Sequence, residues 1–191
     1  MKKNETEQIR IGSRVFAKYL HRDTIKARIQ ELGRDISMDY QDKFPVFIVV
    51  LNGAFMFAAD LVRATAMECQ LEFVKLASYE DVRSTGTIKK IIGIPIPLEG
   101  RHVIIVEDIV DTGRTMDSMI KELKTMDPAS VSVATLLYKP DCLQVAIEST
   151  YVGFEIPDAF VIGYGLDLDG KARNLPDIYQ LAFEDDGTVE G

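Results

Sequence analysis

Nine consecutive residues near the middle of this 191-residue chain combine groups that suit a phosphate and a sugar: Glu107-Asp108-Ile109-Val110-Asp111-Thr112-Gly113-Arg114-Thr115. The backbone N–H groups of residues 112–115 are expected to open a helix, where several of them lack intrahelical partners and lie at the positive end of the dipole. Gly113 lets the backbone approach a ligand, and the hydroxyls of Thr112 and Thr115 add donors. This turn predicts a site for a phosphate monoester, although it lacks the GxxxxGK[ST] pattern of a Walker A loop.

The three acids in the same stretch predict what carries that phosphate. Ionised Glu107 and Asp108 only accept hydrogen bonds, so they would repel a second phosphate but would fit two sugar hydroxyls. Asp111 adds a further acidic group beside the turn. Together, these residues predict binding of a ribose 5-phosphate.

The flanking sequence provides a strand and a helix to position this turn. Residues 103–106 form an unbroken apolar, β-branched run, typical of a parallel strand that is covered on both faces. After the turn, apolar residues fall on one helical stripe that stops at Asp127-Pro128; they are Met116, Met119, Ile120, Leu123 and Met126. The turn is therefore expected at the carboxyl edge of a sheet, where open α/β folds bind ligands.

Residues 103–115 as a whole resemble the signature of the type I phosphoribosyltransferases, which bind phosphoribosyl diphosphate. The resemblance implies an α/β fold with a mostly parallel central sheet, flanked by helices, and a small hood built from the terminal segments. We expect one domain over residues 1–191, with its core at about 24–150 and its hood at about 1–23 and 151–191.

Composition and length narrow the class of protein. A length of 191 residues suits one domain with a sizeable core, and no apolar run approaches the roughly 20 residues that a membrane helix needs. The start of the chain lacks the apolar region of a signal peptide, and Cys69 and Cys142 form neither a CxxC pair nor a metal-ligand spacing. The net charge of −8 argues against a nucleic-acid polymer as partner. We expect a cytoplasmic protein with reduced thiols and no membrane partner.

Periodicity predicts the remaining elements. Apolar residues at helical spacing predict a helix from Thr24 to Tyr40, with Asp23 as its N-cap, and a second helix from Phe55 to about Ala66. Strand patterns are found in an N-terminal segment at 9–16 and at 45–51, 71–77, 89–94, 131–137 and 178–183.

The turn after the 45–51 strand predicts a second anion site. Its Asn52-Gly53-Ala54 sequence again joins a strand to a helix N-terminus, although a glycine needed only for packing explains it equally well. The resemblance implies that Leu51, Asn52 and Gly53 are the pyrophosphate loop, often with a cis peptide at Leu51–Asn52. Many relatives carry Lys at the position of Asn52.

Residues 78–87 are polar and show no periodicity, so on composition alone they predict a hairpin. The Ser78-Tyr79 pair followed by Ser-Thr-Gly resembles the lid of hypoxanthine-guanine phosphoribosyltransferases. Such a lid would exclude water from a sugar that becomes cation-like during the reaction.

Two C-terminal segments resemble the purine-binding parts of the same family: Leu-Leu-Tyr-Lys at 136–139, and Val-Gly-Phe-Glu-Ile-Pro-Asp at 152–158 followed by Phe-Val-Ile-Gly-Tyr-Gly-Leu-Asp at 160–167. The resemblance implies that Lys139 donates to the 6-oxo group of the purine. It further implies that Phe160 stacks on the base and that Val161 reads it through its main chain. Asp167 would lie near the purine and ligate Mg²⁺, together with Glu107 and Asp108, and Arg173 would bind pyrophosphate.

These features predict purine salvage by a glycosyltransferase: Mg²⁺-dependent transfer of 5-phosphoribose to N9 of hypoxanthine or guanine, giving IMP or GMP and pyrophosphate. Asp111 would relay the N7 proton of the base. Lys139 disfavours adenine, whose 6-amino group is a donor. A xanthine-preferring enzyme and a nucleotide-sensing regulatory protein on the same fold remain alternatives, and a dimer or tetramer is expected.

Overall fold

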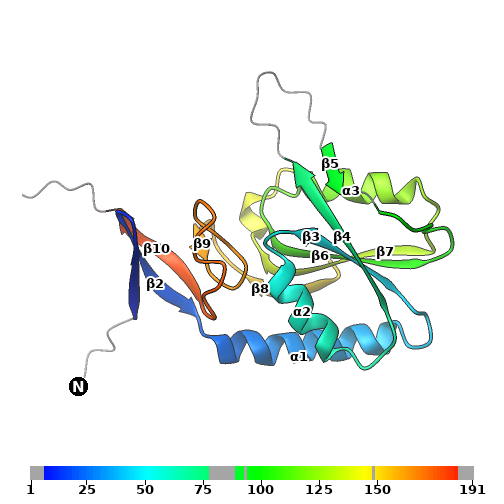
Figure 1. Cartoon of the computed structure of the whole chain (residues 1–191), viewed down its shortest axis with the longest axis horizontal. Coiled ribbons are helices and arrows are strands. Elements are labelled where there is room, and N and C mark those ends of the chain that lie inside the picture. The colour runs from blue at the N-terminus through cyan, green and yellow to red at the C-terminus, as the bar shows by residue number, and fades with distance from the viewer. Residues whose placement is uncertain (1–6, 78–88, 93, 148, 185–191) are drawn as a thin grey trace, which may run out of the picture.

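The computed structural model describes residues 7–77, 89–92, 94–147 and 149–184. Two sheets of unequal size make up the structure, a small one at one end and a large one flanked by helices (Figure 1). The strands are β1 (Gln8–Ile11), β2 (Arg14–Leu20), β3 (Val46–Leu51), β4 (Gln70–Ala77), β5 (Lys89–Ile92), β6 (His102–Val110), β7 (Ser130–Tyr138), β8 (Tyr151–Glu155), β9 (Val161–Ile162) and β10 (Ile178–Glu184). The helices are α1 (Arg22–Asp39), α2 (Phe55–Ala64), α3 (Arg114–Lys124) and a 3-10 turn, η1 (Pro140–Cys142).

The large sheet has the order β5-β4-β3-β6-β7-β8. Strands β4, β3, β6, β7 and β8 run parallel, and β5 pairs antiparallel with β4 at the edge. This arrangement confirms the predicted mostly parallel α/β sheet. The large sheet extends to Glu155, beyond the core boundary expected at residue 150, because β8 pairs with β7 rather than joining the hood.

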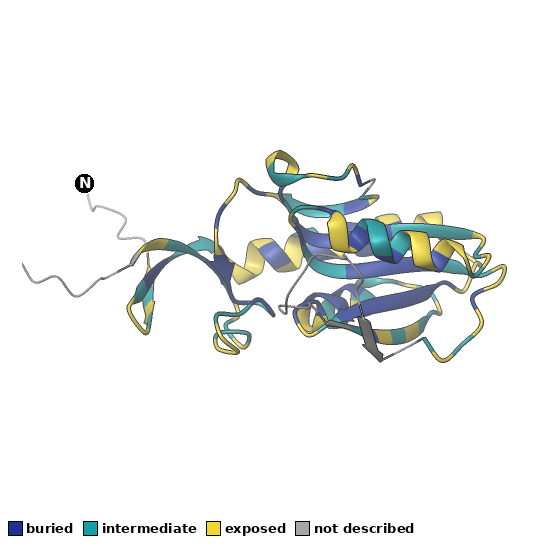
Figure 2. Cartoon of the chain, turned by 90° about the horizontal axis from the view of Figure 1, so that it is seen from above, coloured by how far each residue is buried: buried dark blue, intermediate teal, exposed yellow. Residues whose placement is uncertain are grey.

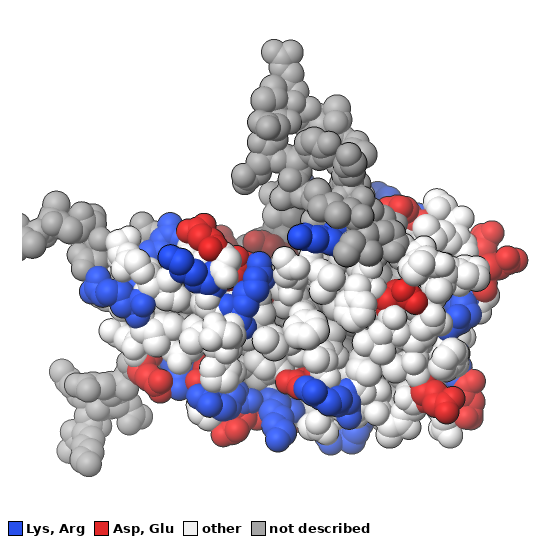
Figure 3. Space-filling model, viewed as in Figure 1, with Lys and Arg blue, Asp and Glu red and all other residues white. Residues whose placement is uncertain are grey.

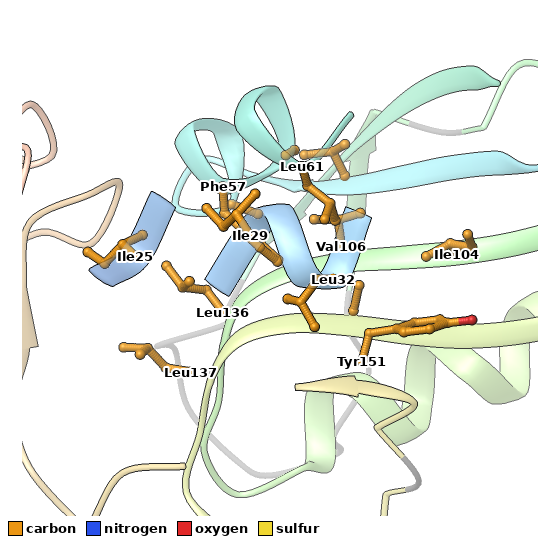
Figure 4. Close-up of a cluster of buried hydrophobic side chains, with 14 of the residues drawn as sticks. Ile25, Ile29, Leu32, Phe57, Leu61, Ile104, Val106, Leu136, Leu137 and Tyr151 are labelled. Carbon is orange, nitrogen blue, oxygen red and sulfur yellow. The ribbon is translucent and has the colours of Figure 1, made fainter. Parts of the chain in front are cut away.

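Helices cover both faces of the large sheet, which is why its central strands are apolar without alternation. Ile104 and Val106 of β6 face α1 and α2, whereas Val103 and Ile105 face α3. Figure 4 shows the first of these cores, with side chains of α1 and α2 against Val106. In Figure 2 the buried residues follow the strands of the large sheet, and the exposed ones lie on the outer sides of the helices.

Helix α1 packs closely on α2 because it carries a glycine at the crossing. A Cβ at Gly33 would lie 2.6 Å from the Cβ of Ala64, so any larger residue would push the helices apart. The predicted N-cap of α1 was wrong: the helix begins at Arg22, and the Nδ1 of His21 accepts a hydrogen bond from the N–H of Asp23 at 3.2 Å. The sequence pattern could not distinguish His21 from Asp23 as the N-cap, because both side chains offer a hydrogen-bond acceptor.

The small sheet has the order β1-β2-β10-β9 and forms the hood from both ends of the described chain. A buried carboxylate ties it to α1. Asp177 accepts hydrogen bonds from the N–H of Arg22 at 2.8 Å and from its guanidinium at 2.9 and 3.1 Å, and lies 3.0 Å from the Lys18 ammonium. Among the described helices, none combines the length and apolar character needed to cross a membrane.

Candidate active site

Three connections leave the carboxyl ends of neighbouring parallel strands at one edge of the large sheet: residues 52–54 after β3, 111–113 after β6 and Lys139 after β7. The hood lies at the same end of the molecule (Figure 1). The structure therefore brings together the three turns that the sequence singled out separately.

The predicted phosphate turn forms the N-terminus of α3. Gly113 is the N-cap residue with a φ of 78°, and the first intrahelical bond runs from the N–H of Asp117 to the carbonyl of Gly113. A Cβ at Gly113 would lie 2.6 Å from the carbonyl oxygen of Val145, so the turn requires glycine on two grounds. The N–H groups of the first helical turn point out of the helix without intrahelical acceptors.

A cavity of about 120 Å³ lies at this helix N-terminus. It is lined by Glu107, Ile109, Val110, Asp111, Thr112, Gly113, Thr115 and Met116. This size and the helix dipole suit a single phosphate group. Arg114, which the sequence assigned to the same site, is exposed at the first helical position, outside this lining set.

Glu107 and Asp108 belong to β6 and not to the turn, because the strand continues to Val110. Asp108 accepts a hydrogen bond from the N–H of Ile109 at 2.9 Å. The Oε2 atom of Glu107 is buried and finds no hydrogen-bond partner in the part of the chain that the structure describes. Burial raises the pKa of Glu107 well above its ordinary value, and the nearby charge of Asp108 adds to this. A hydroxyl donor or a cation would satisfy that oxygen.

The pyrophosphate loop predicted after β3 lies against Asp108. The Leu51–Asn52 peptide is cis, as the family resemblance implies. A Cβ at Gly53 would lie 1.5 Å from the Oδ2 of Asp108, and a Cβ at Gly165 would lie 2.1 Å from the carbonyl oxygen of Gly53. Glycine at positions 53 and 165 therefore allows this loop to contact both Asp108 of β6 and the hood.

Arg173 and Asp167 stabilise the hood segment that reaches this loop. The Arg173 guanidinium donates to the carbonyl of Gly165 at 2.7 Å and lies 2.7 Å from the Oδ1 of Asp167. The Oδ2 of Asp167 accepts from the N–H of Gly170 at 2.7 Å. Within the described ranges, no three Asp, Glu, His or Cys side chains are grouped to hold a metal. Glu107, Asp108 and Asp167 therefore do not form a preformed three-carboxylate metal site.

The donor set still fits Mg²⁺. This ion binds hard oxygen ligands and usually takes one or two carboxylates together with substrate oxygens and water, rather than an all-protein cage. Glu107, which lines the cavity, and its neighbour Asp108 supply such oxygens, and the Oε2 atom of Glu107 has no hydrogen-bond partner among the described residues.

Lys139 lies beside the phosphate turn with its side chain only 7% exposed. Its ammonium is 3.3 Å from the Oδ2 of Asp111 and 3.1 Å from the Oδ1 of Asp158. Burial alone would lower the pKa of Lys139, but the two carboxylates outweigh it and raise the pKa. Sequence reasoning identified Lys139 and Asp111 and missed Asp158, although it lies within the matched 152–158 segment.

Phe160 presents an aromatic face at the hood, with 44% of the residue exposed. Phe16 of β2 packs behind it with ring centroids 6.2 Å apart, and the Arg14 guanidinium lies 5.9 Å from the Phe160 centroid. Val161 follows in β9, buried and paired with Gln180. Arg14 and Phe16 could not be assigned to this site from the sequence, because the N-terminal segment carries no recognisable motif.

The remaining predicted site residues, Ser78 and Tyr79, lie outside the described residues.

Charges on the molecule are unevenly spread. On the face shown in Figure 3, Lys and Arg side chains gather over the small sheet, and the middle of the face formed by the large-sheet half is mostly uncharged.

Comparison with known proteins shows which family this chain resembles. The family model of the phosphoribosyl transferase domain matches residues 17–169. The hypoxanthine-guanine phosphoribosyltransferase of Bacillus subtilis (strain 168) is 39% identical over 81% of this chain and 86% of that protein. The enzyme of the same name from Aquifex aeolicus (strain VF5) is 38% identical over 85% of this chain and 92% of its own length.

Similar solved structures also include hypoxanthine-guanine and hypoxanthine phosphoribosyltransferases. The hypoxanthine phosphoribosyl transferase of Trypanosoma cruzi superposes with a TM-score of 0.83 at 36% identity, covering 91% of this chain and 94% of that one. A hypoxanthine-guanine phosphoribosyltransferase from Bacillus anthracis gives 0.82 at 35% identity, covering 87% and 96%. The resemblance noted in the sequence is confirmed, and the chain belongs to the phosphoribosyltransferase family, within its hypoxanthine-guanine phosphoribosyltransferase group.

Proposed function

We propose that this protein is a purine-salvage enzyme that transfers 5-phosphoribose from phosphoribosyl diphosphate to N9 of hypoxanthine or guanine. One observation carries the proposal: Asp111 lines the phosphate cavity at the α3 N-terminus and also contacts the buried ammonium of Lys139. In this proposal the phosphate site and the donor to the oxo group lie on either side of one carboxylate. Such an order suits a nucleoside 5′-monophosphate product, whose sugar lies between its phosphate and its base.

The turn at the N-terminus of α3 binds the 5-phosphate. Backbone N–H groups of residues 113–115 donate to the phosphate oxygens, the hydroxyls of Thr112 and Thr115 add donors, and the helix dipole favours the negative charge. Glu107, which lines the same cavity, and its neighbour Asp108 hold the ribose hydroxyls. Because the turn is fixed at both ends by β6 and α3, it orients the sugar before the base arrives.

Mg²⁺ is the proposed cofactor, and when bound it neutralises charge on the departing pyrophosphate. Glu107, Asp108 and Asp167 would contribute oxygens to it or to its waters. The loop at Leu51, Asn52 and Gly53 and the Arg173 side chain lie at the same edge and would bind the pyrophosphate itself.

The base is held between the hood and the core. Phe160 stacks on the purine, the main chain of Val161 contacts its edge, and the Lys139 ammonium donates to the 6-oxo group. Adenine presents a donor at that position, so the hydrogen bond between the ammonium and the base would not form. Asp111 accepts the N7 proton, which raises the nucleophilicity of N9.

A coupled assay with hypoxanthine, guanine, xanthine and adenine tests the proposal. With phosphoribosyl diphosphate and Mg²⁺, we expect IMP from hypoxanthine, GMP from guanine and pyrophosphate from both, with little turnover of adenine. Chelation of Mg²⁺ by EDTA should abolish product formation, and added Mg²⁺ should restore it. Absence of product from all four bases would contradict the proposal, and faster turnover of xanthine than of guanine would revise its substrate.

Self-association belongs to the same proposal. Helix α2 and strand β4 expose four large apolar side chains: Phe55, Met56, Leu71 and Phe73. Such side chains are commonly covered by a second copy of the chain. Light scattering after size exclusion should give two or four times the chain mass of 21.4 kDa, and a monomer at micromolar concentration would contradict it.

The thiols of Cys69 and Cys142 are free, which suits the proposed location in the cytoplasm.

A further inference from the structure

The ammonium of Lys139 is paired with two carboxylates on different segments, and the proposed reaction uses only one of them. Asp111 follows β6 and borders the phosphate cavity. Asp158 lies on the connection between β8 and β9, which stays close to Lys139 because the N–H of Ile156 donates to the carbonyl of Tyr138 at 2.8 Å. The second carboxylate therefore reaches the ammonium from the side of the hood.

We propose that Asp158 is a positioning residue for Lys139, which keeps its ammonium aimed at the oxo group of the base when Asp111 is released from it. This inference deepens the proposed function and depends on it. Asp158 does not touch the reacting atoms and acts only through Lys139.

Burial of the Lys139 charge has a free-energy cost that a counter-charge must offset. An ammonium that is almost fully buried is unfavourable unless a counter-charge accompanies it. When a base binds, its neutral oxo group takes one of the ammonium's hydrogen bonds, and Asp111 turns to the purine N7. Asp158 is then the only one of the two carboxylates that still balances the Lys139 charge.

Asp158 is suited to this part because it stays ionised and does not block the base. Hydrogen bonding and charge from Lys139, aided by a hydrogen bond from Cys142, hold the pKa of Asp158 below its ordinary value. Its side chain is 79% exposed, so water solvates the oxygen atom that faces away from the ammonium.

The position of Asp158 also links two contacts with the base. It stands two residues before Phe160, the proposed stacking aromatic, on the same connection. An ion pair from this connection to Lys139 in the core fixes the distance between the stacking ring and the oxo-group donor. Loss of the pair should therefore weaken recognition of the base and leave binding of the sugar phosphate intact.

The test compares Asp158→Asn with Asp141→Asn. Both substitutions remove one negative charge near Lys139, but among the described residues only Asp111 and Asp158 pair with its ammonium. Calorimetry would measure binding of IMP and of ribose 5-phosphate, which lacks the base. We expect Asp158→Asn to weaken IMP binding about tenfold, the effect of one charge-assisted hydrogen bond. Ribose 5-phosphate should bind both variants like the wild type, and Asp158→Glu should regain part of the IMP affinity.

Equal IMP affinity in the two Asn variants would overturn the inference. A parallel loss of ribose 5-phosphate binding in Asp158→Asn would also overturn it, because a structural defect would then be the cause. If the wild-type protein binds ribose 5-phosphate but not IMP, the proposed function fails and the inference fails with it. Normal wild-type turnover of hypoxanthine beside an unaffected Asp158→Asn variant would refute the inference alone.

Discussion

The proposed phosphate side and the proposed base side of this site are built in different ways. Every residue that lines the phosphate cavity falls between Glu107 and Met116, so one strand, one turn and one helix start provide it. The base side joins Lys139 and Asp158 to Phe160, with Phe16 packed behind the ring. A phosphate needs backbone N–H groups, which a short segment supplies, whereas a planar base must be held between distant segments. Substitutions on the two sides should therefore affect different substrates.

Asp111 belongs to both sides, so its replacement should have the largest effect. We expect Asp111→Asn to lower kcat about 10²–10⁴-fold, the usual range for a lost acid–base group. Steady-state kinetics with hypoxanthine would measure it, with Asp141→Asn as the charge control. A normal kcat in Asp111→Asn would remove Asp111 from the proton relay and leave the two sides without a shared group.

Gly113→Ala should damage the phosphate side alone. Alanine in the left-handed region costs roughly 1–2 kcal/mol, and its Cβ would also lie 2.6 Å from the Val145 carbonyl oxygen. Backbone strain and the clash together would cost roughly 2–3 kcal/mol and would favour another conformation of the turn. We therefore expect KM for phosphoribosyl diphosphate to rise on the order of 100-fold, because binding must restore the original conformation.

Gly100→Ala provides the matched control for that variant. Gly100 has a similar φ of 67°, but apart from its chain neighbours no described residue has an atom within 4 Å of the added Cβ. Its KM values should stay near those of the wild type. An equal rise in KM for both glycine variants would show that the contact with Val145 is unimportant.

How well each side could be predicted follows from the same contrast. The strand, turn and helix around Gly113 are contiguous, so hydrophobic period predicted these elements, and the residue types of the turn led to the proposed phosphate chemistry. The apolar run at 103–106 did not reveal that the strand continues through Glu107 and Asp108, because such a run marks the buried part of a strand and not its polar end. The ion pair of Asp158 joins segments 19 residues apart in sequence, and the packing of Phe16 on Phe160 joins segments still farther apart. No local pattern encodes either contact.

Phe160→Ala should damage the base side alone. Stacking of a base on an aromatic ring is worth roughly 1–3 kcal/mol, so we expect KM for hypoxanthine to rise about tenfold. Binding of ribose 5-phosphate should not change. Phe44→Ala, which removes a ring of similar exposure beyond the C-terminal end of α1, is the control. Weaker ribose 5-phosphate binding in Phe160→Ala would mean that the two sides are not independent.

Replacement of Asp177, the buried carboxylate that joins the hood to α1, should lower the stability of the fold more than the rate of the reaction. Burial alone would raise the pKa of Asp177, but hydrogen bonds from Arg22 and Lys18 outweigh it and hold the pKa well below its ordinary value. A lowered folded-state pKa stabilises the protein above the unfolded value of roughly 3.9, and this contribution is lost as the pH falls through the folded-state pKa.

We therefore expect Asp177→Asn to lower Tm at pH 7 by roughly 4–8 °C, as for the loss of a hydrogen bond to a charged group in a chain of this size. Thermal unfolding followed by circular dichroism from pH 7 to pH 2 would measure this, and the gap between wild type and variant should narrow below pH 4. A gap that widens in acid would contradict the assigned sign.

The central claim is that the N-terminus of α3 binds the 5-phosphate of the sugar. A crystal structure with inosine 5′-monophosphate tests it most directly. The account predicts phosphate oxygens at about 2.7–3.2 Å from the backbone nitrogens of residues 113–115, with the ribose hydroxyls beside Glu107 and Asp108. A nucleotide whose phosphate lies away from this helix end would contradict the account.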